Sequence, residues 1–301
     1  MSSLALMLMM QYLISTKAGL VNFVQGNVNV AVGDVAPAGT PIKTGGGALA
    51  EILLNPGSFM RMAENSEVVI DKAELSEIAL TVMNGAVVIE ASEIYPEYPV
   101  KVTTGNLSVL IVQSGVYKFD NGKATVIQGT LATADSRIPY KKGWSVVSKD
   151  NVYRSLKVAK NEPATAVEQW SETRSALLLA ANVQTYQTFR RARVMTPSTS
   201  SWMWVPSFGA WTYWPTYRTR SAYGRQNYAS YNYTEAVGNS NGGSRSSDSN
   251  SSGGGFGGNS GGGGSVGGGG GGGYNPAADR PTVRETIQIK NGPPGPPGGS
   301  N

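Results

Sequence analysis

Short apolar segments alternate with turn-forming residues from Gly19 to about Ser148. Within the segments, apolar and polar positions alternate, as at Val87 and Ile89. A period of two is expected of strands with one buried face. The series predicts an all-β domain, as a sandwich, a barrel or a solenoid-like stack of short strands. The predicted strands are residues 20–24, 28–32, 49–54, 59–62, 68–70, 78–83, 86–90, 100–103, 107–112, 116–119, 124–127 and 144–147.

Turn signals separate these strands. Asn-Gly pairs between alternating segments are the strongest short hairpin signal. The turn sequences are Gly33-Asp34, Asn55-Pro56-Gly57, Asn84-Gly85, Gly105-Asn106 and Asp120-Asn121-Gly122. Gly45-Gly46-Gly47 is also interpreted as a tight turn between strands. It lacks the Gly-Lys-Ser/Thr ending of a phosphate-binding loop, and strand-like sequence follows it.

The pattern changes after Lys160 to one that predicts a long helix. Pro163 suits the first turn of a helix, and residues 164–193 contain no other proline and no glycine. Arginines close the segment, where cations complement the negative end of a helix. Spacings of three and four residues form one apolar stripe, able to lie on the β-domain, from Val167, Trp170, Leu177, Leu178 and Ala181.

The C-terminal third is aromatic first and then of low complexity. Residues 195–233 are rich in Trp, Tyr and Pro, and residues 240–273 are mostly Gly and Ser, typical of a flexible linker. Thr282–Lys290 alternates and could form one strand. Gly292–Gly298 resembles two collagen triplets, too few for a triple helix. We therefore expect a β-domain over residues 18–160, a helix over 161–194, an aromatic segment over 195–237 and a disordered Gly-rich tail over 238–301.

Residues 1–17 are predicted to be an export signal. Leu4–Met10 is apolar, matches the length of a signal-peptide core and is too short to cross a membrane. No Lys or Arg precedes it. The alternative is that Leu4–Ile14 forms a buried first strand or helix. The expected location is the periplasm, the cell surface or another part of the envelope.

Composition narrows the chemistry. The 301 residues include no His and no Cys, which excludes Ser–His and Cys–His nucleophile pairs, disulfides and thiolate metal sites. We therefore expect a protein that binds or scaffolds rather than an enzyme, with no cofactor and no metal. No spacing singles out an acid–base pair among the carboxylates, and Asp71–Glu77 is interpreted as a solvated loop. The carboxylates considered are Glu64, Glu67, Asp71, Glu74, Glu77 and Glu90.

A basic, aromatic segment is the most site-like feature. The net charge is +5, and residues 186–233 contain six arginines and no acidic residue. Arginines could hold anionic groups, and rings could stack on or bury a partner. The predicted partner-binding residues are Arg190, Arg191, Arg193, Trp202, Trp204, Trp211, Tyr213 and Trp214. The alternative is that the four tryptophans pack back onto the β-domain.

Several blocks in the β-region together resemble the FecR-like domain family. The resemblance covers about Ala18 to Ser148 and depends on the order of the blocks. They are Gly33-Asp34 with Ile42–Thr44, Ala50–Ser58, Phe59–Met62 with Asn65-Ser66, Leu80–Ala86, Pro99–Thr104 and Val126–Leu131. Residues 164–233 resemble an extension found in exported FecR-domain proteins of the acidobacterial type, whose function is unassigned.

The resemblance implies an all-β, extracytoplasmic module that works through protein contacts. It carries over no catalytic or ligand residues, because the family pattern consists of turn glycines and apolar strand positions. The regulator that names the family has a sigma-factor-binding region and a membrane helix before this domain. Only about 18 residues precede the match here, so we expect no sigma-factor signalling through this chain.

We therefore expect an envelope protein that binds a protein partner through a strand edge or the aromatic surface. The alternatives are a glycan- or peptidoglycan-binding module and a self-assembling surface protein. Nucleic-acid binding is the least favoured, although interleaved Arg and aromatic residues suit stacked bases over a phosphate track.

Overall fold

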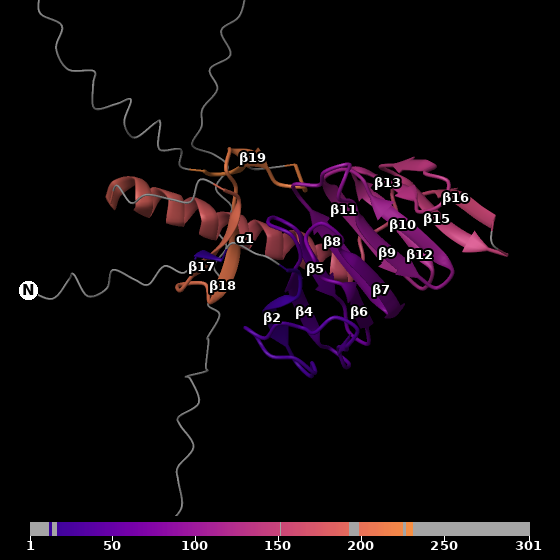
Figure 1. Ribbon diagram of the computed structural model, residues 1–301, viewed down its shortest axis with the longest axis horizontal. Helices are drawn as coiled ribbons and strands as arrows, with labels where there is room; N and C mark the ends of the chain where they lie inside the picture. The colour runs from indigo at the N-terminus through magenta and orange to yellow at the C-terminus, as the bar shows by residue number, and fades with distance from the viewer. Residues whose placement is uncertain (1–11, 14–16, 151, 193–198, 225–226, 231–301) are drawn as a thin grey trace, which may run out of the picture. The chain divides into compact units, whose positions relative to one another are not determined.

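The computed structural model describes residues 12–13, 17–150, 152–192, 199–224 and 227–230. The predicted mainly β architecture is confirmed: two large sheets form a sandwich, followed along the chain by one long helix and a β-hairpin (Figure 1). The Gly-rich tail, including Thr282–Lys290, lies outside the described residues. Within them, no helix combines the length and hydropathy that a membrane crossing requires.

One sheet of the sandwich has eight strands and the other has seven. In spatial order, the first comprises β16 (Val152–Lys157), β15 (Trp144–Lys149), β12 (Lys123–Gln128), β11 (Gly115–Asp120), β8 (Ala86–Ala91), β5 (Phe59–Met62), β4 (Leu49–Leu53) and β2 (Leu20–Gln25). The second comprises β14 (Pro139–Lys141), β13 (Thr130–Thr133), β10 (Leu107–Ile111), β9 (Val100–Thr104), β7 (Ala79–Asn84), β6 (Glu67–Lys72) and β3 (Pro41–Lys43).

The main hydrophobic core lies between these sheets. Met60 and Ile89 of the eight-stranded sheet and Val68, Val102 and Ile111 of the seven-stranded sheet are all inaccessible to solvent. Every second side chain along strands such as β8 and β10 enters this core, which is the period of two expected of strands. Burial of this kind contributes about 25 cal/mol per Å² of apolar surface and is the main term that favours the sandwich.

Most predicted strands coincide with observed ones, and the exceptions have local causes. Residues 28–32 do not form a strand, and Val28 makes only an isolated bridge to Thr44. The pattern missed β3, β13, β14 and β16. Two of these, β3 and β14, have three residues and begin with proline, and β16 is exposed along most of its length. Short or exposed strands leave little hydrophobic periodicity to detect.

Asn84-Gly85 is not a hairpin turn, although three of the other turn signals do join paired strands. β4–β5, β9–β10 and β11–β12 are antiparallel pairs across the predicted turns. By contrast, β7 lies in the seven-stranded sheet and β8 in the eight-stranded sheet. Gly85 has a φ of 79°, and a Cβ there would lie 2.2 Å from Ser66 Oγ. The glycine is therefore required where the chain turns from one sheet to the other.

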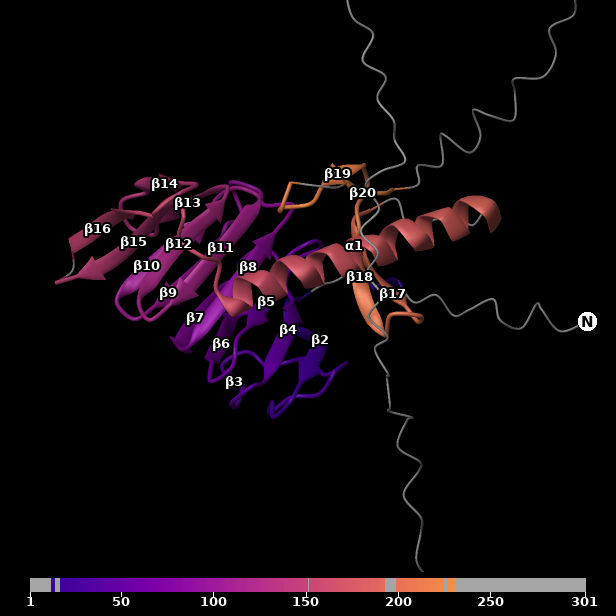
Figure 2. The same ribbon diagram turned by 180° about the vertical axis from the view of Figure 1, so that it is seen from behind.

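The predicted helix is confirmed as α1 (Ala166–Ala192). It begins with a capping box, in which the Thr165 backbone N–H donates to Glu168 at 2.8 Å. It lies across the outer face of the eight-stranded sheet, against β5 and β8 (Figure 2). Its buried stripe differs from the predicted one, because Leu177 is 47% exposed and Trp170 is half-buried. The polar residues Ser171, Ser175, Asn182 and Thr185 are buried instead.

The aromatic segment folds as a hairpin of β17 (Ser201–Val205) and β18 (Ala210–Trp214). Backbone pairing adds β1 (Tyr12–Leu13) to β17, in keeping with the alternative of an N-terminal strand. Residues 1–11 and 14–16 lie outside the described residues, so cleavage of an export signal stays a prediction. A smaller pair, β19 (Thr219–Arg220) and β20 (Asn227–Tyr228), follows.

Candidate functional site

Three charged side chains lie on the sheet face that α1 covers. Arg61 on β5 is directly opposite Glu51 on β4, and Glu90 lies on β8, the other neighbour of β5. Arg61 Nε donates to Glu51 Oε2 at 2.7 Å, and Arg61 Nη1 donates to Glu90 Oε2 at 2.8 Å. All three side chains are at most 1% exposed. The sheet therefore carries a desolvated ion triad where an apolar surface would be expected.

Three residues within one turn of α1 complete the hydrogen bonding of this triad. Ser171 Oγ accepts from Arg61 Nη1 at 2.9 Å, and Ser175 Oγ donates to Glu90 Oε1 at 2.7 Å. Arg174 Nε donates to Glu51 Oε1 at 3.1 Å. Spacings of three and four residues place these side chains on one helix face. The resulting polar network contains two carboxylates and two guanidinium groups, so its formal charges balance.

Burial and charge oppose each other in this polar network. Burial lowers the pKa of Arg61, but Glu51 and Glu90 outweigh it and raise that pKa above its ordinary value. Burial also raises the pKa of Glu90, while Arg61 and Ser175 act in the opposite direction. Because these groups are paired and inaccessible, they hold the helix on the sheet and cannot exchange protons with a substrate.

Two buried asparagines fasten the hairpin to the rest of the protein. Asn22 Nδ2 donates to the Trp211 carbonyl at 3.0 Å, and its Oδ1 accepts from the Trp211 N–H at 2.7 Å. Asn182 on α1 donates to the Tyr213 carbonyl at 3.0 Å and accepts from the Ala229 N–H at 2.8 Å. These amides satisfy backbone groups that the sheets leave without partners.

Replacing Asn182 with Ala is expected to lower the free energy of unfolding by about 1–3 kcal/mol, because buried backbone groups lose their partner. Thr188→Ala is the control, since Thr188 is exposed on the same helix. Urea denaturation of both variants measures the difference. Equal stabilities would show that Asn182 does not fasten the hairpin.

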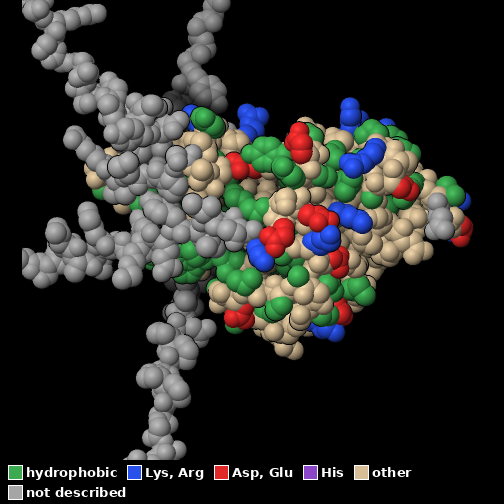
Figure 3. Space-filling view, viewed as in Figure 1, with side chains coloured by type: hydrophobic (Ala, Val, Ile, Leu, Met, Phe, Trp, Pro, Cys, Tyr) green, Lys and Arg blue, Asp and Glu red, His purple; other side chains and the backbone are tan. Residues whose placement is uncertain are grey.

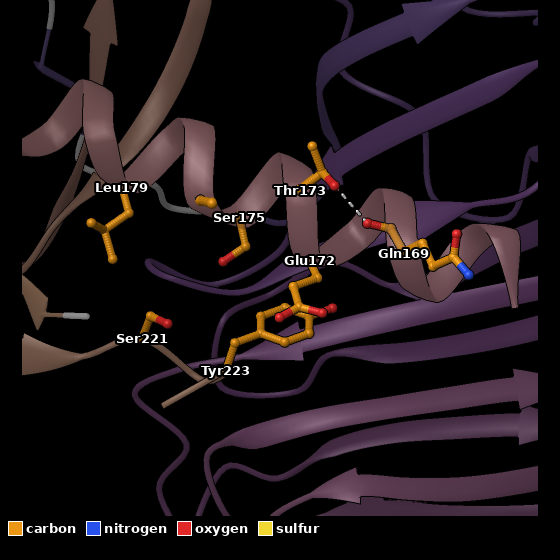
Figure 4. A pocket seen from close by; sticks show the side chains of 8 residues that line it. Gln169, Glu172, Thr173, Ser175, Leu179, Ser221 and Tyr223 are labelled. Atoms are coloured by element: carbon orange, nitrogen blue, oxygen red, sulfur yellow. Dashed lines mark hydrogen bonds between the residues drawn. The ribbon is translucent and has the colours of Figure 1, made fainter. Parts of the chain in front are cut away.

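A cavity of about 500 Å³ lies beside the polar network, between α1 and the segment that leads to β20. Figure 4 shows Ser175 and Glu172 on the helix side and Ser221 and Tyr223 across from them. Tyr223 donates to Ser171 Oγ at 2.7 Å, which links the cavity wall to the network. Leu179 supplies an apolar wall.

This cavity can form hydrogen bonds, and it offers one carboxylate to a cationic or hydroxylated group. Burial raises the pKa of Tyr223 to about 12, so its hydroxyl stays protonated. Its single proton is donated to Ser171, which leaves the oxygen to accept a hydrogen bond. Across the described part of the chain, no three Asp or Glu side chains gather closely enough to hold a metal ion.

The arginines of the predicted binding segment lie at the end of α1. Arg190 and Arg191 are exposed in the last helical turn. Arg193 lies outside the described residues. The exposed pair is available to an anionic partner, and binding by these arginines stays a prediction.

The five predicted aromatic residues divide into two groups. Trp202, Tyr213 and Trp214 are at most 1% exposed and belong to the core. Trp204 and Trp211 are half-buried and pair across the hairpin, with ring centroids 5.6 Å apart. Burial leaves the first group no ring face for a ligand, which agrees with the alternative that these rings pack onto the protein. Only the Trp204–Trp211 pair keeps accessible ring surface.

The buried rings join the hairpin to both of its neighbours. Trp202 packs edge-on against Phe59 of β5 at 5.0 Å between centroids, and Trp214 packs against Phe189 of α1 at 5.5 Å. Alternation along the strands directs these rings to opposite faces. The hairpin therefore packs against the sheet through Trp202 and against the C-terminal part of α1 through Trp214.

Charged residues outside the polar network do not gather by sign on the face that Figure 3 shows. Figure 3 shows acidic and basic side chains interspersed on the face that Figure 1 presents. Asp71 and Lys72, predicted to begin a loop, are the last residues of β6, and the mostly exposed turn to Glu77 follows them, with an ion pair of 2.6 Å between Lys72 and Glu77. Exposed pairs of this kind contribute about 0–1 kcal/mol and do not mark a site.

Residues 40–132 match the model of the family described as FecR protein. No curated protein matches the chain. Similar solved structures include two crystal structures of candidate anti-sigma factors from Parabacteroides distasonis ATCC 8503. One is 10% identical, with a TM-score of 0.33 over 40% of this chain and 60% of the other. The second is 14% identical, with a TM-score of 0.35 over 44% and 64%. The chain spans less than two thirds of the length of each.

Proposed function

Because residues 40–132 form a FecR domain, we propose that this chain is a non-enzymatic protein-interaction module that works in the cell envelope after export. FecR-type proteins are regulatory and act through protein contacts. The charged cluster of Arg61, Glu51 and Glu90 is buried and internally paired, so it is not open to a partner. A partner must therefore be recognised by the surface.

The observation that carries this proposal is the open edge at β16. This strand ends the eight-stranded sheet, and Val152 and Leu156 on one of its faces are 56% and 51% exposed. Trp144 on the neighbouring β15 is 39% exposed and pairs with Lys157, so it lies on the opposite face from Leu156. An edge strand presents unpaired backbone groups, and a partner strand can add to them while its side chains use adjacent apolar positions.

Replacing Leu156 with Lys is expected to reduce partner capture by about 10-fold or more, because an apolar anchor becomes charged. Leu177→Lys is the matched control, since Leu177 is an exposed leucine on α1. The measurement is quantitative crosslinking of the tagged chain in intact cells. Equal capture by both variants would exclude β16 as the docking edge.

Export is tested separately by cell fractionation with mass spectrometry of the mature N-terminus. We expect an envelope pool whose first residue lies between about Gln11 and Lys17. A cytoplasmic protein that retains Met1 would contradict the envelope location. It would leave the β16 experiment interpretable as a test of protein binding.

Glycan binding has a narrower structural basis than protein binding. Trp214 is buried, so the Trp204–Trp211 pair would have to supply the stacking surface for a sugar. Retention on cell-wall sacculi that is lost in Trp211→Ala would favour this second function.

A further inference from the structure

A second cavity, of about 350 Å³, lies at one end of the β-sandwich. Three connections meet there: the β4–β5 turn with Pro56, the β6–β7 turn with Leu75 and Ser76, and the crossing from β8 to β9 with Tyr95 and Tyr98. We call this cavity the tyrosine groove. It is separate from β16 and from the cavity beside α1, because it shares no lining residue with either.

Aromatic rings line the tyrosine groove and are unusually open. Tyr95 and Tyr98 are 55% and 53% exposed. A tight turn fixes their spacing, because the Tyr98 N–H donates to the Tyr95 carbonyl at 3.0 Å and Pro96 lies between them. The buried side chains of Ile78 and Val100 form an apolar base. Rigid, exposed tyrosines on an apolar base lose little conformational entropy on binding.

The tyrosine groove is acidic. Glu93 lines it, Glu97 is exposed between the two tyrosines, and no Lys or Arg is among its lining residues. Glu93 accepts hydrogen bonds from Ser200 and Tyr213, which hold its carboxylate in place. The charge of Glu93 raises the pKa of Tyr95, as expected where the local potential is negative. Cationic ligands are therefore favoured over anionic ones.

We propose that the tyrosine groove binds an extended, proline-rich peptide that carries a Lys or Arg beside its prolines. Prolines three residues apart share a face of the polyproline II helix, and aromatic-lined grooves recognise that face with little ordering cost. Tyr95 and Tyr98 would pack against the proline rings, and Glu93 and Glu97 would attract the basic residue. Tyrosine hydroxyls can donate to the peptide carbonyls.

The chain's own sequence supplies a ligand of this class as a probe. Lys290 precedes Pro293, Pro294, Pro296 and Pro297, in which two pairs have the three-residue spacing. A fluorescent peptide with the sequence of residues 290–298 is added to the full chain and to a full chain with these four prolines changed to Ala. Anisotropy measures binding. We expect the peptide to bind saturably to the chain whose four prolines are changed to Ala, because that chain has no proline-rich segment of its own to compete.

Matched variants locate the ligand. Tyr95→Ala with Tyr98→Ala is expected to weaken binding by at least 10-fold, whereas Tyr217→Ala, at a tyrosine that is 71% exposed elsewhere, leaves it unchanged. Replacing Lys290 of the peptide by Glu should weaken binding several-fold, and added salt should weaken the unmodified peptide. Thermal melts verify that each variant is folded.

Each outcome decides the matter. Binding only to the Ala-substituted chain would support peptide binding by the tyrosine groove. It would also indicate that residues 290–298 of the unsubstituted chain compete with the added peptide. Equal binding of a peptide with Ala at all four prolines, or of the Tyr95 and Tyr98 variant, would overturn the proposal. No binding to either chain at about 1 mM peptide, an affinity of about −4 kcal/mol, would also overturn it.

Discussion

Replacing Arg61 with Met is expected to lower the free energy of unfolding by about 3–5 kcal/mol, because two buried carboxylates lose their shared cation. Arg61 is fully buried and donates to Glu51 and Glu90 at 2.7 and 2.8 Å. Methionine keeps part of the side-chain volume, so most of the loss is electrostatic. Urea denaturation monitored by far-UV circular dichroism gives the difference.

Two further variants separate this charge effect from packing. Arg61→Met combined with Glu51→Gln and Glu90→Gln should recover part of the loss, because neutral amides are less costly to bury than unpaired carboxylates. Lys123→Met is the surface control, since its nitrogen is 3.9 Å from Asp120 in a pair whose side chains are 35% and 25% exposed, and should cost under about 1 kcal/mol. If Arg61→Met were as mild as this control, the triad would not hold the structure.

The loss of unfolding free energy in Arg61→Met should depend on pH. Burial raises the pKa of Glu90 above its ordinary 4.5, and Arg61 is the largest opposing influence, so its removal raises that pKa further. The folded variant then binds a proton at pH values where the unfolded chain has lost it. Stability falls with rising pH in that range, so the deficit should be smallest near about pH 5 and larger at about pH 8. A deficit that grows on acidification would contradict this assignment.

Replacing Trp202 with Ala should cost about 3–5 kcal/mol, because it removes a large, fully buried ring between β17 and β5. Trp204→Ala, two residues along the same strand, is the control and should cost less because Trp204 is half-buried. Thermal unfolding of both variants measures the contrast. Near-UV circular dichroism reports whether the hairpin remains packed.

This comparison also bears on the predicted partner surface. If Trp202→Ala folded normally and lost only partner binding, its ring would be a recognition residue and not a core residue. If Trp204→Ala lost partner binding at unchanged stability, the prediction that the half-buried Trp204 contacts a partner would be supported.

The sequence predicted the sandwich well because its signals are local. Apolar residues such as Val87, Ile89 and Val102 alternate on strands, and each occupies the core between the sheets. The helix was also predicted, since the expected residues 161–194 contain Ala166–Ala192, Pro163 precedes it and no other breaker interrupts it. Local turn chemistry correctly placed Gly122 in a hairpin but could not show that Gly85 joins two different sheets.

The polar network could not be predicted in the same way. Glu90 was noted in the sequence as one of several scattered carboxylates, and Arg61 and Glu51 come from strands that become neighbours only on folding. Ser171 and Ser175 gave no helix-face signal, because serine is normally exposed. Their burial follows from the charges beneath them, which require hydrogen-bonding partners on the covering helix.

By itself, the sequence determined the β-domain, the helix, the family resemblance and the absence of histidine and cysteine, because periodicity, turn residues and composition are properties of neighbouring residues. Only the tertiary structure decided which aromatic rings are core, which charges are paired and which surfaces remain open. Trp202 and Trp204 have the same identity and almost the same local sequence, yet one is buried and the other half-buried. The difference arises from contacts with Phe59, more than 140 positions away in the chain, which no local pattern encodes.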